Sequence, residues 1–447
     1  MRNFFTILFV IIQVYVGVKF NFGIFEIAIL CFNCVGTVVF WRKHHLIKES
    51  LFQITVFCAI FFSTFFFSAF PIFPEKYKPT ADAALSFAQF GNQCLAIFFC
   101  SLLLIRIIFP SLDKRNNVET ETPGYRPISN STVWIVIIFM YGLTLFSASI
   151  GLGVMGQEAV QLPFGIGGII VGLRREIAPI LFMLYIHNSL STRKNRSRFL
   201  LLAIVLWAIL ETIVLMSKSS LIYFFLPTFI LLFYTNLVSK KKLARITLPA
   251  ILLFVIGYTT IENLRSMDSV TISGVSDAYK MGNQSDEKVE GRIINRVFTT
   301  PVNFVVIYDF IRNEPTFYFN RFPIVASAGG SAKYRTYVIE SYSSDAHHSS
   351  GTSWLTDPYL LGGKGFVFVT IFLVTLFVML SDRRSPTMYK PMLYSICLII
   401  SMFINWSLLF DGEIAYHIGI WALEWWLIYI YEKKCVIIPR DYLISKE

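Results

Sequence analysis

The sequence predicts an all-α polytopic membrane protein with about twelve transmembrane helices and one large, partly helical external loop between helices nine and ten. Three observations lead to this prediction. The chain is 55% hydrophobic and only 15% charged, whereas soluble domains carry about 25% charged residues. The apolar residues form long runs, and the basic residues lie in every second loop between those runs.

The apolar runs define the predicted helices. A helix needs about 20 apolar residues to cross a bilayer. The runs of suitable length cover 3–20, 22–41, 51–70, 84–109, 133–150, 165–187, 199–216, 219–238, 246–262, 364–381, 392–410 and 414–431. The first is expected to be a membrane helix, because no small-residue cleavage site follows it. The chain thus divides into helices one to nine (1–262), the large loop (263–363), helices ten to twelve (364–431) and a tail (432–447).

The sixth run contains the most unusual charges. Its stretch "GIIVGLRREIAPILF" (168–182) places Arg174, Arg175 and Glu176 between apolar residues. Each such charge costs about 2.5–3.5 kcal/mol at the centre of a bilayer helix. We therefore expect the helix to begin late, near Glu176 and Ile177, after a glycine-rich interfacial or re-entrant segment. Arg175 is then expected to face a cavity, and Arg174 to pair with Glu176 or a lipid phosphate.

Charge orients the predicted bundle. Arg2 and the loops around WRKHHLIK, DKRNN…GYR, TRKNRSR, SKKKLAR, DRRSPTMYK and YEKKC…PRDYLISKE hold more than half of the 39 Lys and Arg residues. By the positive-inside rule these loops and both termini are cytoplasmic. The short loops between them hold few basic residues: Lys19, Lys76, Lys78 and Lys218. The net charge of +11 is thus a topology signal, and a nucleic-acid partner is not expected.

Basic residues also recur on the predicted outer side, where arginine is suited to bind a phosphate through its planar fork. They suit a dianionic pyrophosphate head group held at the bilayer. The large loop contains a segment with apolar positions at helical spacing, 291–313, which carries two of them. The candidate pyrophosphate-binding residues are Arg174, Arg175, Lys218, Arg265, Arg292 and Arg296.

A second group of titratable residues lies late in the loop, in "SYSSDAHHSSGTSWL". A histidine can move protons near neutral pH, so the catalytic candidates are His348, ranked first, His347, Asp345 and Glu340. No pair of acidic residues at metal spacing occurs in the outer loops, and no metal or other cofactor is expected.

Several other polar residues have structural interpretations. Cys31 and Cys34 form a CxxC inside an apolar run and are interpreted as small core residues. Glu26 and Glu424, within spans, are interpreted as polar ties between helices. Glu211 could neutralise Lys218 on the same helix.

These residues resemble the Wzy-type O-antigen polymerases and the related enterobacterial common antigen polymerase, the oligosaccharide repeat-unit polymerases. The resemblance covers the topology of most of the chain. At motif level it rests on "GLRREIAPILFMLYI", "MSKSSLI", "IENLRS", "INRVFTTPVNFVVIYDF" and "DAHHSSGTSWLTDPYLLGGKGF". "MSKSSLI" departs from the family in carrying Lys218 where an arginine is usual, which loses bidentate phosphate geometry.

The resemblance implies a GT-C-like membrane glycosyltransferase in the bacterial inner membrane, with its active site facing the periplasm. Such an enzyme transfers a growing glycan from undecaprenyl pyrophosphate to the next lipid-linked repeat unit. The implied partners are the lipid-linked oligosaccharide, membrane lipids and a chain-length regulator protein. Two alternatives stay open: an O-antigen ligase of the same architecture, and a lipid-linked oligosaccharide flippase or transporter.

Overall fold

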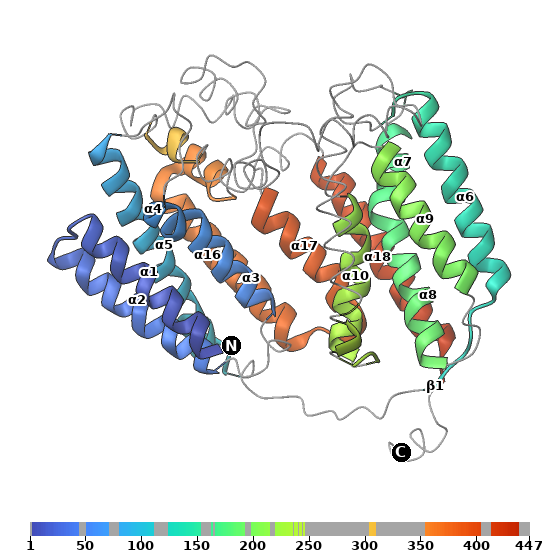
Figure 1. Cartoon of the computed structure of the whole chain (residues 1–447), viewed down its shortest axis with the longest axis horizontal. Coiled ribbons are helices and arrows are strands. Elements are labelled where there is room, and N and C mark those ends of the chain that lie inside the picture. The colour runs from blue at the N-terminus through green and yellow to red at the C-terminus, as the bar shows by residue number, and fades with distance from the viewer. Residues whose placement is uncertain are drawn as a thin grey trace. The chain divides into compact units, whose positions relative to one another are not determined.

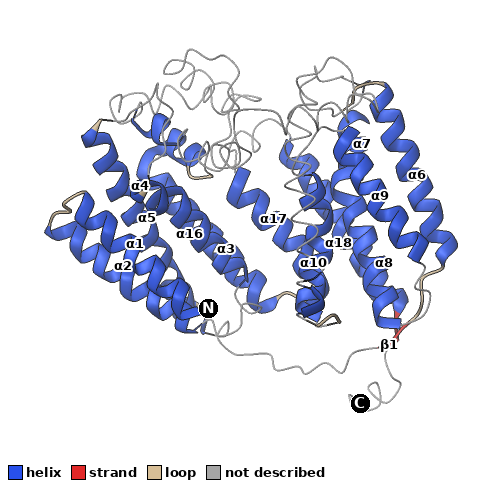
Figure 2. Cartoon of the chain, in the orientation of Figure 1, coloured by secondary structure: helices blue, strands red, loops and turns tan. Residues whose placement is uncertain are grey.

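The computed structural model describes the chain except residues 1, 44–50, 71–79, 111–123, 153–161, 164–165, 193–197, 215–219, 236, 240, 244, 246–303, 310–353, 404–412 and 438–447. The described part is helical (Figure 2), apart from a pairing of two two-residue strands, β1 (Gly124–Tyr125) and β2 (Val436–Ile437). The prediction of an all-α protein is confirmed.

Five described helical stretches are long and apolar enough to cross a membrane, which supports the membrane class. They are Ile24–Arg42, Leu51–Ala69, Ala81–Ile108, Asn130–Ser149 and Gly362–Arg383. Each predicted range except 246–262, which lies outside the described residues, contains a described helix. The number of membrane spans and the extent of the outer loop stay predictions.

The chain folds into two compact units, each assembled from segments that are far apart in sequence. The first unit comprises 1–116, 290–385 and 396–415, and the second comprises 117–289, 386–395 and 416–447.

The first unit is built around helix α5 (Ala81–Ile108). This helix packs against α2 (Ile24–Lys43), α3 (Leu51–Phe61) and α16 (Thr356–Arg384), and α1 (Arg2–Lys19) packs against α2 (Figure 1). A π-helical turn, η2 (Phe62–Phe66), and α4 (Phe67–Ala69) continue α3.

Phenylalanine fills the interior of the first unit. Phe57, Phe61 and Phe98 are fully buried. The ring of Phe61 lies edge-on to Phe9 with 4.7 Å between centroids, and Phe57 stacks on Phe40 at 5.3 Å. Phe57 also lies 6.2 Å from Phe98 of α5, measured between ring centroids. Such aromatic pairs add about 0.5–1.5 kcal/mol to the effect of burial alone, so they hold α1, α2, α3 and α5 together.

Buried polar side chains tie the same helices at defined positions. The amide of Asn92 donates to the carboxylate of Glu26 at 3.1 Å, and Gln93 donates to its other oxygen at 3.1 Å. Asn33 donates in turn to the side-chain oxygen of Asn92 at 2.7 Å. These contacts join α2 to α5 and confirm the interpretation of Glu26 as an interhelical tie.

Asp382, near the end of α16, caps the start of α3. Its carboxylate accepts hydrogen bonds from the backbone N–H groups of Phe52 and Gln53 at 3.3 and 3.2 Å. The first N–H groups of a helix have no partner within the helix, and an acidic group there is favoured by the helix dipole. A residue 330 positions away thus fixes α3 to α16.

A short piece of the predicted outer loop belongs to the first unit. Residues 304–309, inside the predicted helix 291–313, are helical and buried. Tyr308 stacks on Tyr359 of α16 at 4.9 Å and bonds the hydroxyl of Ser86 at 2.8 Å. Phe304 packs edge-on against Phe87 of α5. The loop is therefore anchored to α5 and α16 by aromatic packing.

A glycine pair interrupts α16 where the sequence predicts the start of the tenth span. Gly362 and Gly363 have non-helical backbone angles, and Gly363 has φ 61° and ψ −151°. That region is essentially accessible only to glycine. At Gly362 a Cβ atom would lie 2.4 Å from the ring of Phe366. The break separates a short N-terminal piece of α16 from its long apolar part.

The second unit contains α6 (Asn130–Ser149), α7 (Ile166–Gly172), η5 (Leu173–Ile177), α8 (Ala178–Thr192), α9 (Arg198–Val214), α10 (Ser220–Thr235), η6 (Thr387–Tyr389) and, from Tyr416 onward, α18 (Glu413–Cys435). Helix α17 (Lys390–Phe403) contributes its first residues to this unit. Helix α8 packs on α10, and α6 packs on α9. The interior contains Trp207, Phe182 and Phe224.

The basic end of the second unit is held together by polar contacts. Asn188 accepts a hydrogen bond from the backbone N–H of Ile128 at 2.9 Å and donates to the carbonyl of Arg126 at 2.8 Å. Burial and the Glu432 carboxylate raise the pKa of Tyr389 to about 12. Helix α8 is thereby fixed to the segment that leads into α6, and the backbone N–H of Arg126 in that segment bonds the carbonyl of Cys435 at the end of α18.

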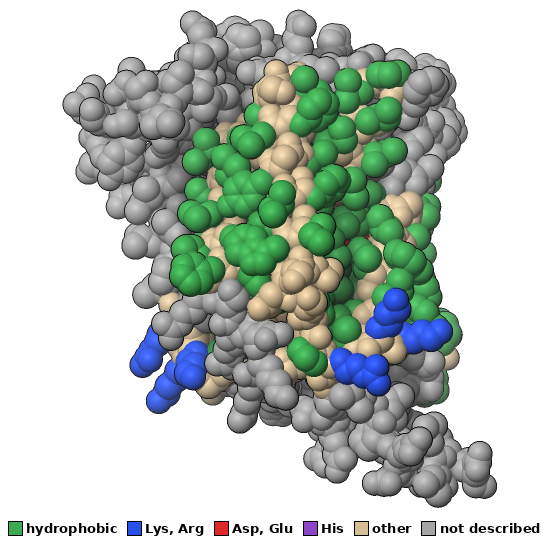
Figure 3. Space-filling model, turned by 90° about the vertical axis from the view of Figure 1, so that its right-hand side faces the viewer, with side chains coloured by type: hydrophobic (Ala, Val, Ile, Leu, Met, Phe, Trp, Pro, Cys, Tyr) green, Lys and Arg blue, Asp and Glu red, His purple; other side chains and the backbone are tan. Residues whose placement is uncertain are grey.

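One face of the molecule has the surface expected in a membrane. A broad field of apolar side chains covers it, and the Lys and Arg side chains gather at one edge (Figure 3). On α6, Ile135 and Ile138 are 69% and 66% exposed. A continuous apolar surface of this kind is disfavoured in water.

The glycine break in α16 can be tested through the stability of the protein. Gly363→Ala forces a side chain into a glycine-only conformation and should lower the free energy of unfolding by about 1–3 kcal/mol. Gly365→Ala is the matched control, because a Cβ atom there meets nothing within 4 Å. The control should be neutral or slightly stabilising. Unfolding midpoints in detergent measure both, and equal midpoints would contradict the prediction.

Candidate functional site

The arginine pair lies inside a continuous helix. Helix α7 begins at Ile166, passes through the π-helical turn η5 and continues as α8 to Thr192. Gly172 and Ala178, on either side of the turn, both have helical angles. The expectation of a helix start near Glu176, after an interfacial or re-entrant segment, was therefore wrong: the glycine-rich residues from Ile166 onward are helical.

Pro179 explains the position of the π turn. A proline has no N–H to donate four residues back, and its ring clashes with that carbonyl, which here belongs to Arg175. The helix relieves this by widening one turn: the N–H of Ala178 bonds the carbonyl of Leu173, five residues back. Single π turns of this kind are frequent at functional sites.

Arg174 is fully enclosed and forms an ion pair. It is 1% exposed, and its partner Glu211 of α9 is 4% exposed. Arg174 Nη2 and Nε donate to the same oxygen, Glu211 Oε2, at 2.9 and 3.1 Å. The pairing differs from both sequence-based expectations, which joined Arg174 to Glu176 or lipid phosphate and Glu211 to Lys218. A buried arginine without a neighbouring negative charge is very costly. Arg174 is therefore paired with a carboxylate that is itself buried beside it, that of Glu211.

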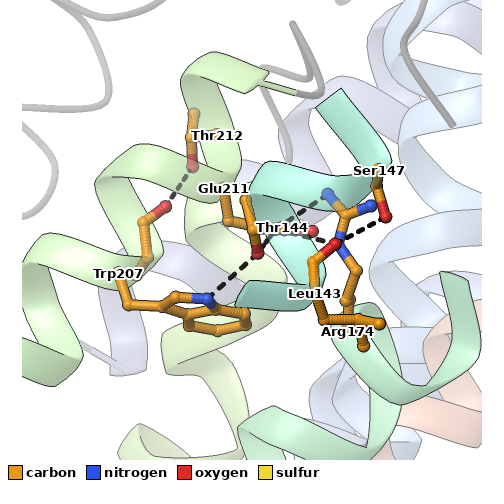
Figure 4. Close-up of polar contacts among 8 residues, drawn as sticks. Leu143, Thr144, Ser147, Arg174, Trp207, Glu211 and Thr212 are labelled. Atoms are coloured by element: carbon orange, nitrogen blue, oxygen red, sulfur yellow. Dashed lines mark hydrogen bonds and ion pairs between the residues drawn. The ribbon is translucent and has the colours of Figure 1, made fainter. Parts of the chain in front are cut away.

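Two neutral donors complete the Glu211 site (Figure 4). Thr144 of α6 donates to Glu211 Oε2 at 2.8 Å, and the indole N–H of Trp207 donates to the Thr144 hydroxyl at 3.1 Å. Trp207 and Glu211 are four residues apart on α9 and share one face. The network joins α6, α9 and the π turn and fixes which side of the turn faces inward.

Two buried polar atoms of the network lack hydrogen-bond partners among the described residues. They are Arg174 Nη1 and Glu211 Oε1. Such groups are rare in folded proteins and call for an explanation, such as an internal water. The charges of Arg174 and Glu211 thus compensate each other, but one polar atom of each side chain makes no hydrogen bond to a described residue.

A second polar pair lies on the other side of the π turn. Glu176 Oε1 is 3.8 Å from Nδ1 of His417 on α18, an ion-pair distance that is longer than a hydrogen bond. Both side chains are 22% exposed. Arg175, which is half-buried, is the sequence neighbour of Glu176 and acts on it electrostatically. The turn therefore presents one enclosed cation and one partly accessible cation beside a Glu–His pair.

Helix α18 adds an aromatic ring and an acid on the same face. His417 stacks on Trp421 with 5.8 Å between ring centroids. Glu424 follows seven residues after His417 and is buried. Its Oε2 has no hydrogen-bond partner in the described part of the chain. The interpretation of Glu424 as an interhelical tie stays a prediction.

Of the predicted site residues, only Arg174 and Arg175 lie in the described part of the chain. The remaining candidates fall outside it: Lys218, Arg265, Arg292, Arg296, Glu340, Asp345, His347 and His348. Their convergence on the arginine pair stays a prediction.

The structure identifies functional candidates that the sequence analysis missed. His417 was not considered, although it precedes Trp421 and Glu424 at helical spacing in "YHIGIWALEWW". Within the described residues, no group of three or more His, Cys, Asp or Glu side chains is arranged to hold a metal ion.

Comparison of the chain with protein-family models, with curated proteins and with solved structures gave no match.

The buried ion pair can be tested by removing its members separately and together. Glu211→Ala leaves the Arg174 charge buried without its partner and should lower the free energy of unfolding by about 3–5 kcal/mol. The double variant Arg174→Met, Glu211→Leu removes both charges and should be more stable than Glu211→Ala alone. Arg42→Ala, at an exposed position, is the control and should change little. A double variant less stable than Glu211→Ala would contradict a compensating pair.

Proposed function

We propose that the protein is a membrane glycosyltransferase that polymerises lipid-linked oligosaccharide repeat units. In the proposed reaction, a glycan on undecaprenyl pyrophosphate is transferred to the next repeat unit at the periplasmic face of the bacterial inner membrane. Undecaprenyl pyrophosphate is released. The observation that carries this proposal is the π turn, where the partly accessible Arg175 lies beside the Glu176–His417 pair within an apolar helical unit.

The position of the turn along its helices supports an outward-facing site. Arg174 lies eight residues after Ile166, or about 12 Å along the helix axis. Glu211 lies in the last turn of α9, which ends at Val214. The start of α7 and the end of α9 are the helix ends that lie far in sequence from the basic loops. The positive-inside rule assigns those loops to the cytoplasm, so these two helix ends are expected on the outer side.

The chemistry of the turn suits a leaving pyrophosphate. Negative charge develops on the pyrophosphate oxygen as the glycosidic bond breaks, and a preorganised cation in a water-poor site stabilises it. Arg175 is the candidate for this contact because Arg174 is enclosed and neutralised by Glu211. Lys218, Arg265, Arg292 and Arg296 remain proposed further contacts, and a chain-length regulator remains a proposed partner.

The reaction also needs a group that takes the proton of the attacking hydroxyl. The sequence offers His348, His347, Asp345 and Glu340 in the outer loop, and no metal ion is required for this role.

A flippase or transporter of the same lipid-linked glycan is the second candidate. One observation favours it: the Arg174–Glu211 pair and Glu424 are buried within a helical unit, and ionisable residues inside membrane bundles often mark transport pathways. The O-antigen ligase shares the chemistry of the polymerase and differs in its acceptor.

Purified protein incubated with lipid-linked repeat units tests the enzymatic proposal. It should lengthen the glycan and release undecaprenyl pyrophosphate, and Arg175→Ala should lower the rate about 100-fold, as expected for loss of one charge-stabilising contact. Arg42→Ala should retain the wild-type rate. Movement of lipid-linked glycan across vesicles without product release would instead support the transporter.

Deletion of the protein in the cell separates the polymerase from the ligase. Loss of a polymerase should leave lipopolysaccharide with a single repeat unit. Absence of any glycan on the lipid A core would contradict the polymerase and point to a ligase or flippase.

A further inference from the structure

Glu176, which the sequence predicts as a partner of Arg174, instead forms a titratable pair with His417. The pair joins the π turn to α18 through Glu176 Oε1 and His417 Nδ1, 3.8 Å apart. Both side chains are 22% exposed, so the pair is neither sealed in the core nor fully solvated.

Nδ1 is the nitrogen of His417 that lies within ion-pair distance of the Glu176 carboxylate. A carboxylate on that side favours the tautomer that carries its proton on Nδ1. Nε2 then bears the lone pair. A carboxylate that orients an imidazole in this way also stabilises the imidazolium that forms when Nε2 accepts a proton. Separations in unliganded sites are often long and tighten when substrate binds.

The surrounding charges suit the same role. Arg175 adjoins Glu176 in the turn, Glu424 lies two turns along α18, and the Arg174–Glu211 pair lies across the turn on α9. Helices α6 and α10, which also pack on the turn, contain no Asp, Glu, Lys, Arg or His in their sequences. The Trp421 ring stacks on His417 and holds its plane. The pair is thus built on helices, where side-chain positions are more precise than in loops.

We propose that His417 is the general base of the glycosyl transfer and that Glu176 is the residue that positions it. This inference rests on the proposed function and selects a base in the membrane unit over the candidates in the outer loop. The acceptor hydroxyl oxygen forms a bond to the anomeric carbon, and its proton passes to His417 Nε2. The bond from that carbon to the pyrophosphate oxygen breaks, and its electron pair leaves on the pyrophosphate beside Arg175.

The test measures glycan extension by the full-length protein with lipid-linked repeat units, for His417→Ala, Glu176→Gln and His348→Ala. We expect His417→Ala to lower kcat at least 100-fold, to lose the acidic limb of the pH profile of kcat/KM, and to regain activity when imidazole is added. Glu176→Gln should lower kcat about 10-fold with little change in KM. Imidazole should not stimulate the wild type.

Two results would overturn the inference alone: wild-type kcat in His417→Ala, or a loss that imidazole does not restore and that leaves the pH profile unchanged. The second result would indicate a structural contact, and unfolding midpoints of the variants show whether the fold is intact. Imidazole rescue of His348→Ala but not of His417→Ala would return the base to the outer loop. Failure of the wild-type protein to release undecaprenyl pyrophosphate would overturn the proposed function and this inference together.

Discussion

The requirement that a buried charge be paired shapes the second unit. Arg174 is enclosed by apolar helices, and Glu211 provides the compensating charge from α9. Because both Arg174 donors and Thr144 converge on one oxygen, the pair fixes the position of α6, the rotation of the π turn and the end of α9 together. The same rotation sets the directions of the next two side chains. Because Arg174 faces Glu211, Arg175 and Glu176 point to other sides of the helix, where they remain partly accessible.

The first unit solves a similar problem with different chemistry. Its buried carboxylates, Glu26 and Asp382, are bound by side-chain amides and backbone N–H groups. Hydrogen bonds from neutral donors stabilise a carboxylate without bringing a second charge into the apolar interior. Aromatic rings pack between the helices of this unit, and they also attach residues 304–309 to α5 and α16. Among the described residues, Glu26 and Asp382 thus accept hydrogen bonds from neutral groups, whereas Glu211 accepts hydrogen bonds from both an arginine and Thr144.

The helices could be predicted from the sequence because apolar length is a local property, and the ranges agree to within a few residues for α1, α2, α5 and α6. The structure inside the sixth run could not be predicted in the same way. Charge cost alone suggested a late helix start, whereas Pro179 and a partner in α9 allow the arginines to remain helical. Pro179 was visible in the sequence. The partner was not, because Glu211 lies 37 residues from Arg174 and a single sequence does not show which helices pack together.

The π turn also bears on how this site can change over time. A π turn is one residue inserted into an α-helix, and removal of that residue restores the regular pitch. Successive residues of an α-helix differ by about 100° in direction. A one-residue deletion between Leu173 and Ile177 would therefore turn this stretch into regular α-helix while α7 and α8 keep the directions they face. Only the side chains of the turn itself, the two arginines and Glu176 among them, would change direction, so a single-codon deletion would alter the polar groups of the turn without disturbing either flanking helix.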